Sequence, residues 1–248
     1  MTESLHLTLL GGWDLTGADR APMPVSQQTQ RLVALVALSR RPSREYVAGT
    51  LWPEESEHHA HSSLRTLLFR LRRRDELGGL LSITESSIAL AREVTVDVDQ
   101  VAACASALVA GRTCASTPDP MSLLTQGDLL PGWYDDWVHP QRERLRQLRL
   151  HALEAVAEGC RDQGRPAEAL DAALAAVHIE PLRESSNRVV VGVHLQEGNV
   201  VEALRHYHYF ERLLHDELRI PPTTLMTDLV RPFLATGGRR SHAALTPA

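Results

Sequence analysis

An internal repeat with a period of 34 residues limits the folds open to this chain more than any other feature of its sequence. Residues 164–170 and 198–204 both carry the pattern G-x-x-x-E-A-L, and the same offset pairs Leu148-Arg149 with Leu182-Arg183. Repeats of this length form helix–turn–helix units that stack on their neighbours. The glycine permits a tight turn between two helices, and the small alanine lets those helices approach closely. The second part of the chain is therefore expected to be a helical array.

Thirty-four residues is the period of the tetratricopeptide repeat. Two such units leave apolar faces open, so further helices must cover them. We expect one helix from Val98 to Ala110, a long one from Gln141 to Gln163 and a last one after Pro221-Pro222. Residues 97–235 are thus predicted to form an all-α tetratricopeptide-like domain for protein interaction or oligomerisation, and residues 236–248 a disordered tail.

The first 96 residues have a different order of elements. Alternating leucines in residues 5–10 predict a half-buried strand, and Ser26 and Ser43 are N-caps for two helices. A third helix is expected from Pro53 to Gly78, and the alternation in residues 80–91 predicts a small hairpin. Strands, three helices and a hairpin in this order indicate a winged helix over residues 1–96. In that fold the third helix enters the major groove and the hairpin, or wing, lies along the DNA backbone.

The predicted third helix has two contrasting faces. Ala60, Leu64, Leu67 and Leu71 recur at spacings of four, three and four, which places them on one buried stripe. The stretch from residue 65 to residue 74 contains five arginines and no acid. The residues predicted to contact DNA are Ser62, Arg65, Thr66, Phe69, Arg70, Arg72 and Arg73.

These residues are expected to differ in what they contact. Arg65, Arg72 and Arg73 suit phosphate or guanine, and the two hydroxyl groups in the set suit hydrogen bonds to bases or phosphate. Arg70 and Arg74 lie further round the helix, where backbone contacts or intramolecular acids are expected. The alternative is an ordinary surface helix whose arginines are solvated.

The charge distribution requires any DNA affinity to be local. All 26 basic residues are arginine, and the net charge is -5. Residues 1–96 hold 11 arginines and 11 acids, whereas the remainder holds 15 arginines and 20 acids. Because the N-terminal half is neutral overall, a second hypothesis remains open. In it, the chain is a tetratricopeptide-type adaptor that binds proteins without reading DNA directly.

The sequence offers little support for an enzyme, a metal protein or a membrane protein. It has no nucleophile elbow and no phosphate-binding glycine loop, so no catalytic residue and no cofactor are predicted. The histidines at 58, 59, 61, 206 and 208 lack the ligand pattern of a zinc site, so no metal is predicted. Three cysteines without a CxxC pattern favour a reduced, cytoplasmic setting, and no apolar run approaches 18 residues. Trp133, Tyr134 and Trp137 are interpreted as a packing cluster.

With both halves described, the chain resembles the Streptomyces antibiotic regulatory protein (SARP) family of transcriptional activators. The resemblance rests on Leu51-Trp52-Pro53, the arginine-rich helix, Val96-Asp97-Val98-Asp99 at the junction, and above all residues 127–155. EPLRE at 180–184 and ELRIPP at 217–222 are also similar to that family.

The resemblance implies a mainly α protein, with an OmpR-like winged helix (α+β) followed by a bacterial transcriptional activation domain. It also implies binding to promoter direct repeats in double-stranded DNA, side-by-side copies or a homodimer, and recruitment of RNA polymerase holoenzyme to secondary-metabolism genes.

Two departures from the family pattern bear on DNA recognition. The wing lacks the Gly-Tyr pair of many members, which puts its minor-groove contact in doubt. Phe69 stands where many members have a small polar residue, and it is expected either to pack on a sugar or thymine methyl or to be covered by another part of the protein. The sequence leaves open whether the protein activates or represses, and whether it dimerises before it reaches DNA.

Overall fold

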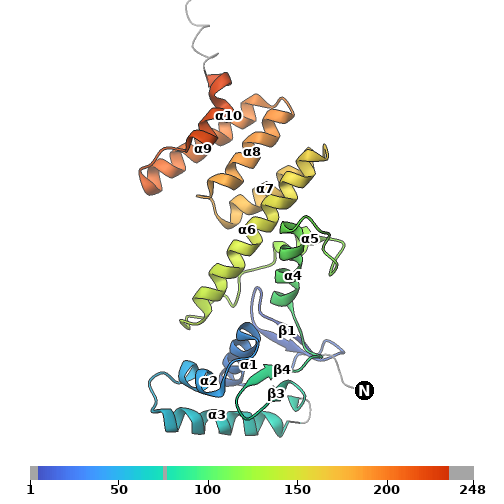
Figure 1. Ribbon diagram of the computed structural model, residues 1–248, viewed down its shortest axis with the longest axis vertical. Coiled ribbons are helices and arrows are strands. Elements are labelled where there is room, and N and C mark those ends of the chain that lie inside the picture. Colours follow the sequence, from blue (N-terminus) through green and yellow to red (C-terminus); the bar gives the residue numbers. More distant parts are fainter. Residues whose placement is uncertain (1–4, 75–76, 235–248) are drawn as a thin grey trace, which may run out of the picture. The chain divides into compact units, whose positions relative to one another are not determined.

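The predicted strand–helix–hairpin order of the N-terminal part is confirmed by the computed structural model, which describes residues 5–74 and 77–234 (Figure 1). The chain divides into two compact units. Unit 1 comprises residues 1–103 and 126–145, and unit 2 comprises residues 104–125 and 146–248. The predicted tail at 236–248 lies outside the described residues.

The three helices of unit 1 begin where serine side chains cap them. Helices α1 (Gln27–Ser39) and α2 (Arg44–Leu51) are capped by Ser26 and Ser43, as predicted, and α3 (Glu57–Arg72) is capped by Ser56, whose hydroxyl accepts a hydrogen bond from the His59 N–H. Helix α3 is therefore shorter than the predicted span from Pro53 to Gly78. The serine cap ends the turn that follows Pro53, so helical hydrogen bonding starts at Glu57.

Two small sheets flank these helices. Strand β1 (His6–Thr8) pairs antiparallel with β2 (Asp14–Thr16) and parallel with β5 (Thr95–Val96), which was not predicted. Strands β3 (Leu81–Ile83) and β4 (Ile88–Leu90) form the predicted hairpin, with Ile83 opposite Ile88. The Asp97 carboxylate accepts hydrogen bonds from the backbone N–H groups of Leu9 and Leu10. It thereby joins the start of α4 (Asp97–Val109) to the two residues that follow β1.

Residues 126–145 belong to unit 1 because backbone and side-chain contacts attach them to it. The Leu130 N–H donates to the Leu9 carbonyl at 2.8 Å, and the Arg31 Nε donates to the Asp135 carboxylate at 2.9 Å. A Cβ on Gly127 would lie 2.8 Å from the Gly11 Cα, so this crossing requires glycine. The predicted boundary at residue 96 stays a prediction.

The aromatic residues of this segment do not form one cluster. The rings of Trp133 and Trp137 meet edge to face at 6.3 Å, as expected for packing. Tyr134 is 86% exposed, so the prediction that it packs with them is wrong. It lies in the extended stretch between two turns, where its side chain faces solvent, a direction that residue type alone does not reveal.

Unit 2 confirms the 34-residue repeat. Helix α6 (Val138–Asp162), which begins in unit 1, is followed by α7 (Pro166–Ile179), α8 (Glu184–Gln196), α9 (Val200–Leu218) and α10 (Thr224–Leu234). The short α5 (Pro120–Leu124) precedes them. Both repeat glycines, Gly164 and Gly198, adopt positive φ, at +69° and +77°. Ala169 and Ala203 are fully buried, where a larger side chain would separate the helices.

The helices of unit 2 are covered as the repeat requires. Helices α7 and α9 both pack against α8, and α10 packs on α8 and α9, which is the covering role expected for the helix after Pro221-Pro222 (Figure 1).

His206, considered above as a metal ligand, is instead hydrogen-bonded to Asn187 at 2.9 Å. Burial, with a smaller contribution from His194, lowers the pKa of His206 to about 4. This side chain is therefore neutral at physiological pH.

The structure pairs two of the three cysteines. Cys104 on α4 and Cys114 form a disulfide with Cα atoms 4.8 Å apart, and Cys160 is a buried free thiol. The sequence carries no signal for this pairing, since ten residues without a CxxC pattern separate the two cysteines. Gly111, at φ +68°, helps to reverse the chain between them.

We expect a thiol reductant to destabilise unit 2, because the disulfide restricts the unfolded chain. For so short a loop the loss is up to about 3 kcal/mol of unfolding free energy. Thermal unfolding with and without reductant measures it, and a Cys114→Ser variant, whose side chain is half-buried, should show no reductant effect. Thiol counting on the oxidised, unfolded protein should find only Cys160. Three free thiols would contradict the pairing.

The described part of the chain contains no helix long and apolar enough to cross a membrane. Within the same residues, no group of three or more histidine, cysteine, aspartate or glutamate side chains is placed to hold a metal ion.

Candidate nucleic-acid interface

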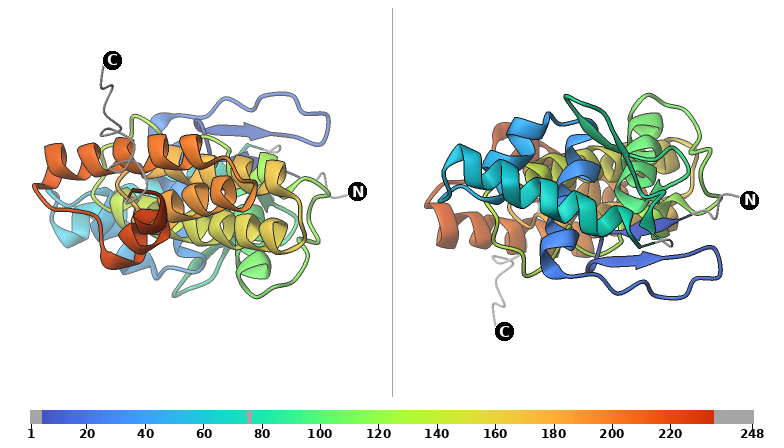
Figure 2. Two further views of the ribbon diagram at one scale, coloured as in Figure 1. Left: turned by 90° about the horizontal axis from the view of Figure 1, so that it is seen from above. Right: turned by 90° about the horizontal axis from the view of Figure 1, so that it is seen from below.

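Helix α3 separates a buried face from an exposed face. The predicted stripe of Ala60, Leu64, Leu67 and Leu71 is buried, and Leu68 is buried beside it. Each residue advances about 100° round a helix, so a shift of two residues moves about 200°, to the opposite side. The residues on that opposite side are Ser62, Thr66, Phe69 and Arg73. Among the described residues of unit 1, no segment lies in front of α3 in the right-hand view of Figure 2.

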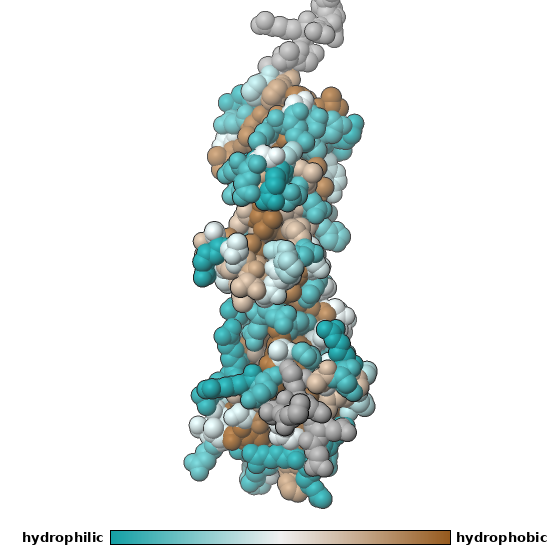
Figure 3. Space-filling view, turned by 90° about the vertical axis from the view of Figure 1, so that its right-hand side faces the viewer, coloured by the Kyte–Doolittle hydropathy of each residue, from teal (hydrophilic) through white to brown (hydrophobic). Residues whose placement is uncertain are grey.

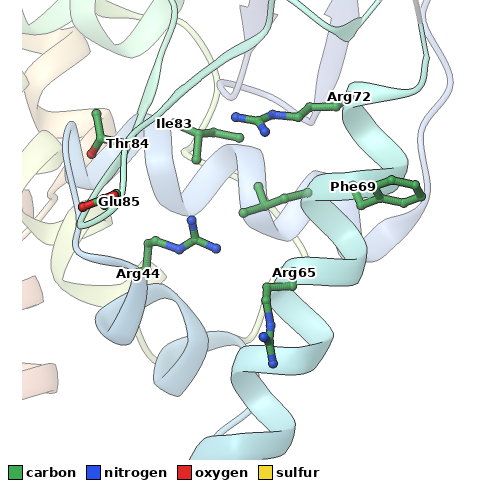
Figure 4. A pocket seen from close by; sticks show the side chains of 8 residues that line it. Arg44, Arg65, Phe69, Arg72, Ile83, Thr84 and Glu85 are labelled. Carbon is green, nitrogen blue, oxygen red and sulfur yellow. The ribbon is translucent and has the colours of Figure 1, made fainter.

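An open groove separates α3 from the hairpin β3–β4. It encloses about 580 Å³ and is lined by Arg44, Arg65, Leu68, Phe69, Arg72, Ile83, Thr84 and Glu85. Figure 4 shows the Arg44 and Arg72 side chains pointing into this space, whereas the Phe69 ring points away from the hairpin. The groove thus collects guanidinium groups from two helices.

The predicted contact residues on α3 also interact with one another. The Arg65 Nη2 donates to the Ser62 Oγ at 3.1 Å, and the Thr66 hydroxyl donates to the Ser62 carbonyl at 3.0 Å. The Arg73 guanidinium lies 5.7 Å from the centroid of the Phe69 ring, within cation–π range. These contacts restrain side chains that remain accessible to solvent.

The arginines round α3 form no ion pair with an acid among the described residues. Within residues 5–74 and 77–234, no ion pair is recorded for Arg44, Arg65, Arg70, Arg72 or Arg73. The lower edge of the space-filling view, where α3 lies, is mainly hydrophilic, with an apolar group protruding at its bottom (Figure 3). Residues 1–96 therefore carry a local concentration of positive charge round α3, although their formal net charge is zero.

Besides Arg73 on the outer face, two further arginines, one on α3 and one just after it, lie away from the groove. Arg70 borders a separate hollow that Gln28, Glu55 and Ser63 also line. The Arg74 guanidinium donates to the Pro24 carbonyl at 2.9 Å. Of the predicted set, the structure therefore places Arg65, Arg72 and Phe69 at the groove, and the others along the outer face or beyond it.

Arg44 is a candidate that the sequence analysis missed. The hairpin turn holds the start of α2, because the Arg44 N–H donates to the Ser86 carbonyl at 3.1 Å and the Ile88 N–H donates to the Pro42 carbonyl at 3.1 Å. This contact joins residues more than forty positions apart. Its only local signal is that Arg44 follows a serine cap, and that signal does not indicate which element lies opposite.

The wing itself is short and polar. The hydroxyl of Thr84 accepts from the Ser87 N–H at 3.0 Å and closes the turn, and Glu85 is exposed at its tip. A carboxylate there is unfavourable next to phosphate. The hairpin therefore brings no positive charge of its own to the groove.

A model of the family described as the bacterial transcriptional activator domain matches residues 89–234. The regulatory protein AfsR of Streptomyces coelicolor is 30% identical over 216 residues, covering 83% of this chain and 22% of AfsR. The regulatory protein AfsR of Streptomyces griseus is 30% identical over 259 residues, covering 99% of this chain and 26% of AfsR. The chain spans about a quarter of the length of these curated relatives.

A solved structure shares the fold. Mycobacterium tuberculosis EmbR, in complex with a low-affinity phosphopeptide, superposes with a TM-score of 0.70 at 19% identity. The match covers 94% of this chain and 66% of EmbR. It confirms the predicted combination of an OmpR-like winged helix with a helical domain.

Proposed function

Because the chain belongs to the SARP family of transcriptional regulators, whose members carry the bacterial transcriptional activator domain, we propose that it binds promoter DNA through α3 and activates transcription by recruiting RNA polymerase holoenzyme. The observation that carries the proposal is the set of exposed arginines round α3 that no described acid pairs with. If α3 were only a solvated surface helix, nothing would call for Arg44, on the separate helix α2, to point into the same groove.

In the proposed complex, α3 lies in the major groove with its outer face towards the base edges. Arg44, Arg65 and Arg72 contact phosphates of the strand that passes between α3 and the hairpin. Such contacts set register and contribute most of the salt-dependent affinity. Ser62 and Thr66 supply hydroxyl groups for bases or phosphate, and Arg70 contacts the backbone on the other side of α3.

The further partners follow from the family resemblance. Residues 1–96 are proposed as the DNA-binding domain and residues 97–235 as the domain that contacts proteins. Side-by-side copies, or a homodimer, bind direct repeats upstream of secondary-metabolism genes. The cytoplasm is the compartment that this role requires, and the role is regulatory rather than catalytic.

A fluorescence-anisotropy titration tests the proposal. Labelled promoter fragments, beginning with the gene's own upstream region, are titrated at several salt concentrations with random duplex as competitor. We expect one fragment to outcompete random DNA and its affinity to fall linearly in a log–log plot against salt, with a slope of about -0.9 per phosphate contacted. In vitro transcription from that fragment then measures whether the protein raises or lowers polymerase output.

Two outcomes would overturn parts of this proposal. Absence of specific binding to any genomic fragment would favour the adaptor hypothesis and leave unit 2 as the functional part. Specific binding with reduced transcription would identify a repressor.

A further inference from the structure

We infer that Phe69 and Arg73 form a two-residue reader of a thymine and a guanine that lie within two base-pair steps of each other in the operator. The inference rests on the proposed DNA-binding function and names the bases that the centre of α3 selects. The juxtaposition that carries it is an exposed phenyl ring with a guanidinium 5.7 Å from its centroid, both on the outer face of α3.

The position of Phe69 points to an external contact. Its side chain is 60% exposed, so the expectation that another described part of the chain covers it is wrong. It occupies the outer face, opposite the buried Leu64 and Leu67, and Figure 4 shows its ring directed away from the hairpin. A helix that docks in a major groove presents this side to the base edges. The ring is therefore aimed at bases rather than at the phosphates beside the groove.

Apolar side chains recognise one feature of the major groove. The thymine 5-methyl group is the apolar group that base pairs display there, and phenylalanine is among the residues that contact it. The phenyl ring at position 69 therefore favours thymine over cytosine, which lacks the methyl.

Arg73 extends the reading to a neighbouring base. Arginine donates two hydrogen bonds to the O6 and N7 atoms of guanine. Arg73 is the C-cap of α3, four residues after Phe69, and thus about 6 Å further along the helix axis. Base pairs are stacked 3.4 Å apart, so both side chains reach base pairs within two steps of each other.

Stacking on Phe69 prepares Arg73 for this contact. A guanidinium that stacks on a ring loses less side-chain entropy on binding, because its donor groups are already oriented. Arg65 and Arg72 lack such an aromatic partner among the described residues, which fits a role on phosphates. Arg73 is thus restrained by an aromatic ring, whereas Arg65 and Arg72 are not.

Single-atom changes in the DNA test the inference. In the operator fragment found by anisotropy, each thymine is replaced in turn by deoxyuridine, which removes only the methyl group. We expect one replacement to weaken wild-type binding about fourfold, which is the change in affinity expected when one buried methyl group is removed. The same replacement should leave the affinity of Phe69→Ala unchanged. Replacement of one guanine within two steps of that thymine by 7-deazaguanine should weaken binding of the wild type but not of Arg73→Ala.

Leu225→Ala is the matched control, because Leu225 is a similarly exposed apolar residue, 65% accessible, on α10. It should retain the wild-type response to both modified bases. If Phe69→Ala binds random duplex with the same affinity as the wild type, its fold is intact. If no deoxyuridine position separates the wild type from Phe69→Ala, the reader assignment is overturned while DNA binding stands. If the wild type binds no fragment specifically, the proposed function itself is overturned.

Discussion

Replacing Arg65, Arg72 and Arg73 together by alanine is expected to weaken operator binding at least about a hundredfold. Each base-contacting arginine contributes on the order of 1–3 kcal/mol, and each phosphate contact contributes to the salt dependence. The three side chains lie on the exposed side of α3 without ion pairs to described residues, so their removal should not disturb the fold. Anisotropy at fixed salt measures the affinity, and the salt series measures the lost phosphate contacts.

The single variants should separate the roles of these residues. Arg65→Ala and Arg72→Ala should each reduce the salt slope by about 0.9 and weaken all sequences similarly. Arg73→Ala should mainly reduce discrimination between operator and random DNA. Arg212→Ala on α9 is the control, since it removes the same charge from an exposed position in unit 2. Wild-type affinity in all three α3 variants would refute the assignment of α3 as the DNA-contacting helix.

The second large effect is expected in unit 2, at a carboxylate that joins two repeat helices. Glu154 on α6 accepts hydrogen bonds from the Arg183 Nε at 2.8 Å and the Arg183 Nη2 at 2.9 Å. The hydroxyls of Ser185 and Ser186 donate to the same carboxylate at 2.5 and 2.7 Å. The Glu154 and Arg183 side chains are 14% and 19% exposed, so this is a largely buried ion pair.

Glu154→Ala should therefore lower the free energy of unfolding by about 3–5 kcal/mol, because it leaves the largely buried charge of Arg183 without a carboxylate partner. Glu168→Ala is the matched control. Glu168 pairs with Arg165 at 2.6 Å but is 59% exposed, so its removal should cost less than about 1 kcal/mol. Chemical denaturation of the three proteins measures the difference. Equal stability of the two variants would contradict a structural role for the Glu154 network.

The same pair makes stability depend on pH. Burial alone would raise the pKa of Glu154, but the hydrogen bonds from Arg183, Ser185 and Ser186 outweigh it and lower the pKa from 4.5 to about 2. Because the folded pKa is below the unfolded pKa, this stabilisation is fully present above pH 4.5 and is lost as the pH falls towards 2. The stability difference between the wild type and Glu154→Gln should narrow over that range. A difference that stays constant would show that the charge of Glu154 is not involved.

Features set by neighbouring residues could be predicted from the sequence. The caps at Ser26 and Ser43, the buried stripe of α3 and the 34-residue repeat all depend on spacings within one element or between adjacent elements. The candidate residues on α3 followed from the same periodicity. Helix ends were less well predicted, because the Ser56 cap competes with several other start signals near Pro53.

The sequence by itself determined the order of elements, the repeat and the arginine-bearing face of α3, since each is written in short-range patterns. Only the tertiary structure decided which distant segments meet. The parallel pairing of β1 with β5, the disulfide between Cys104 and Cys114, and the arrival of Arg44 beside the α3 arginines are examples. These contacts depend on how elements pack after they form, and the packing energy is shared among many residues, so no local pattern records it.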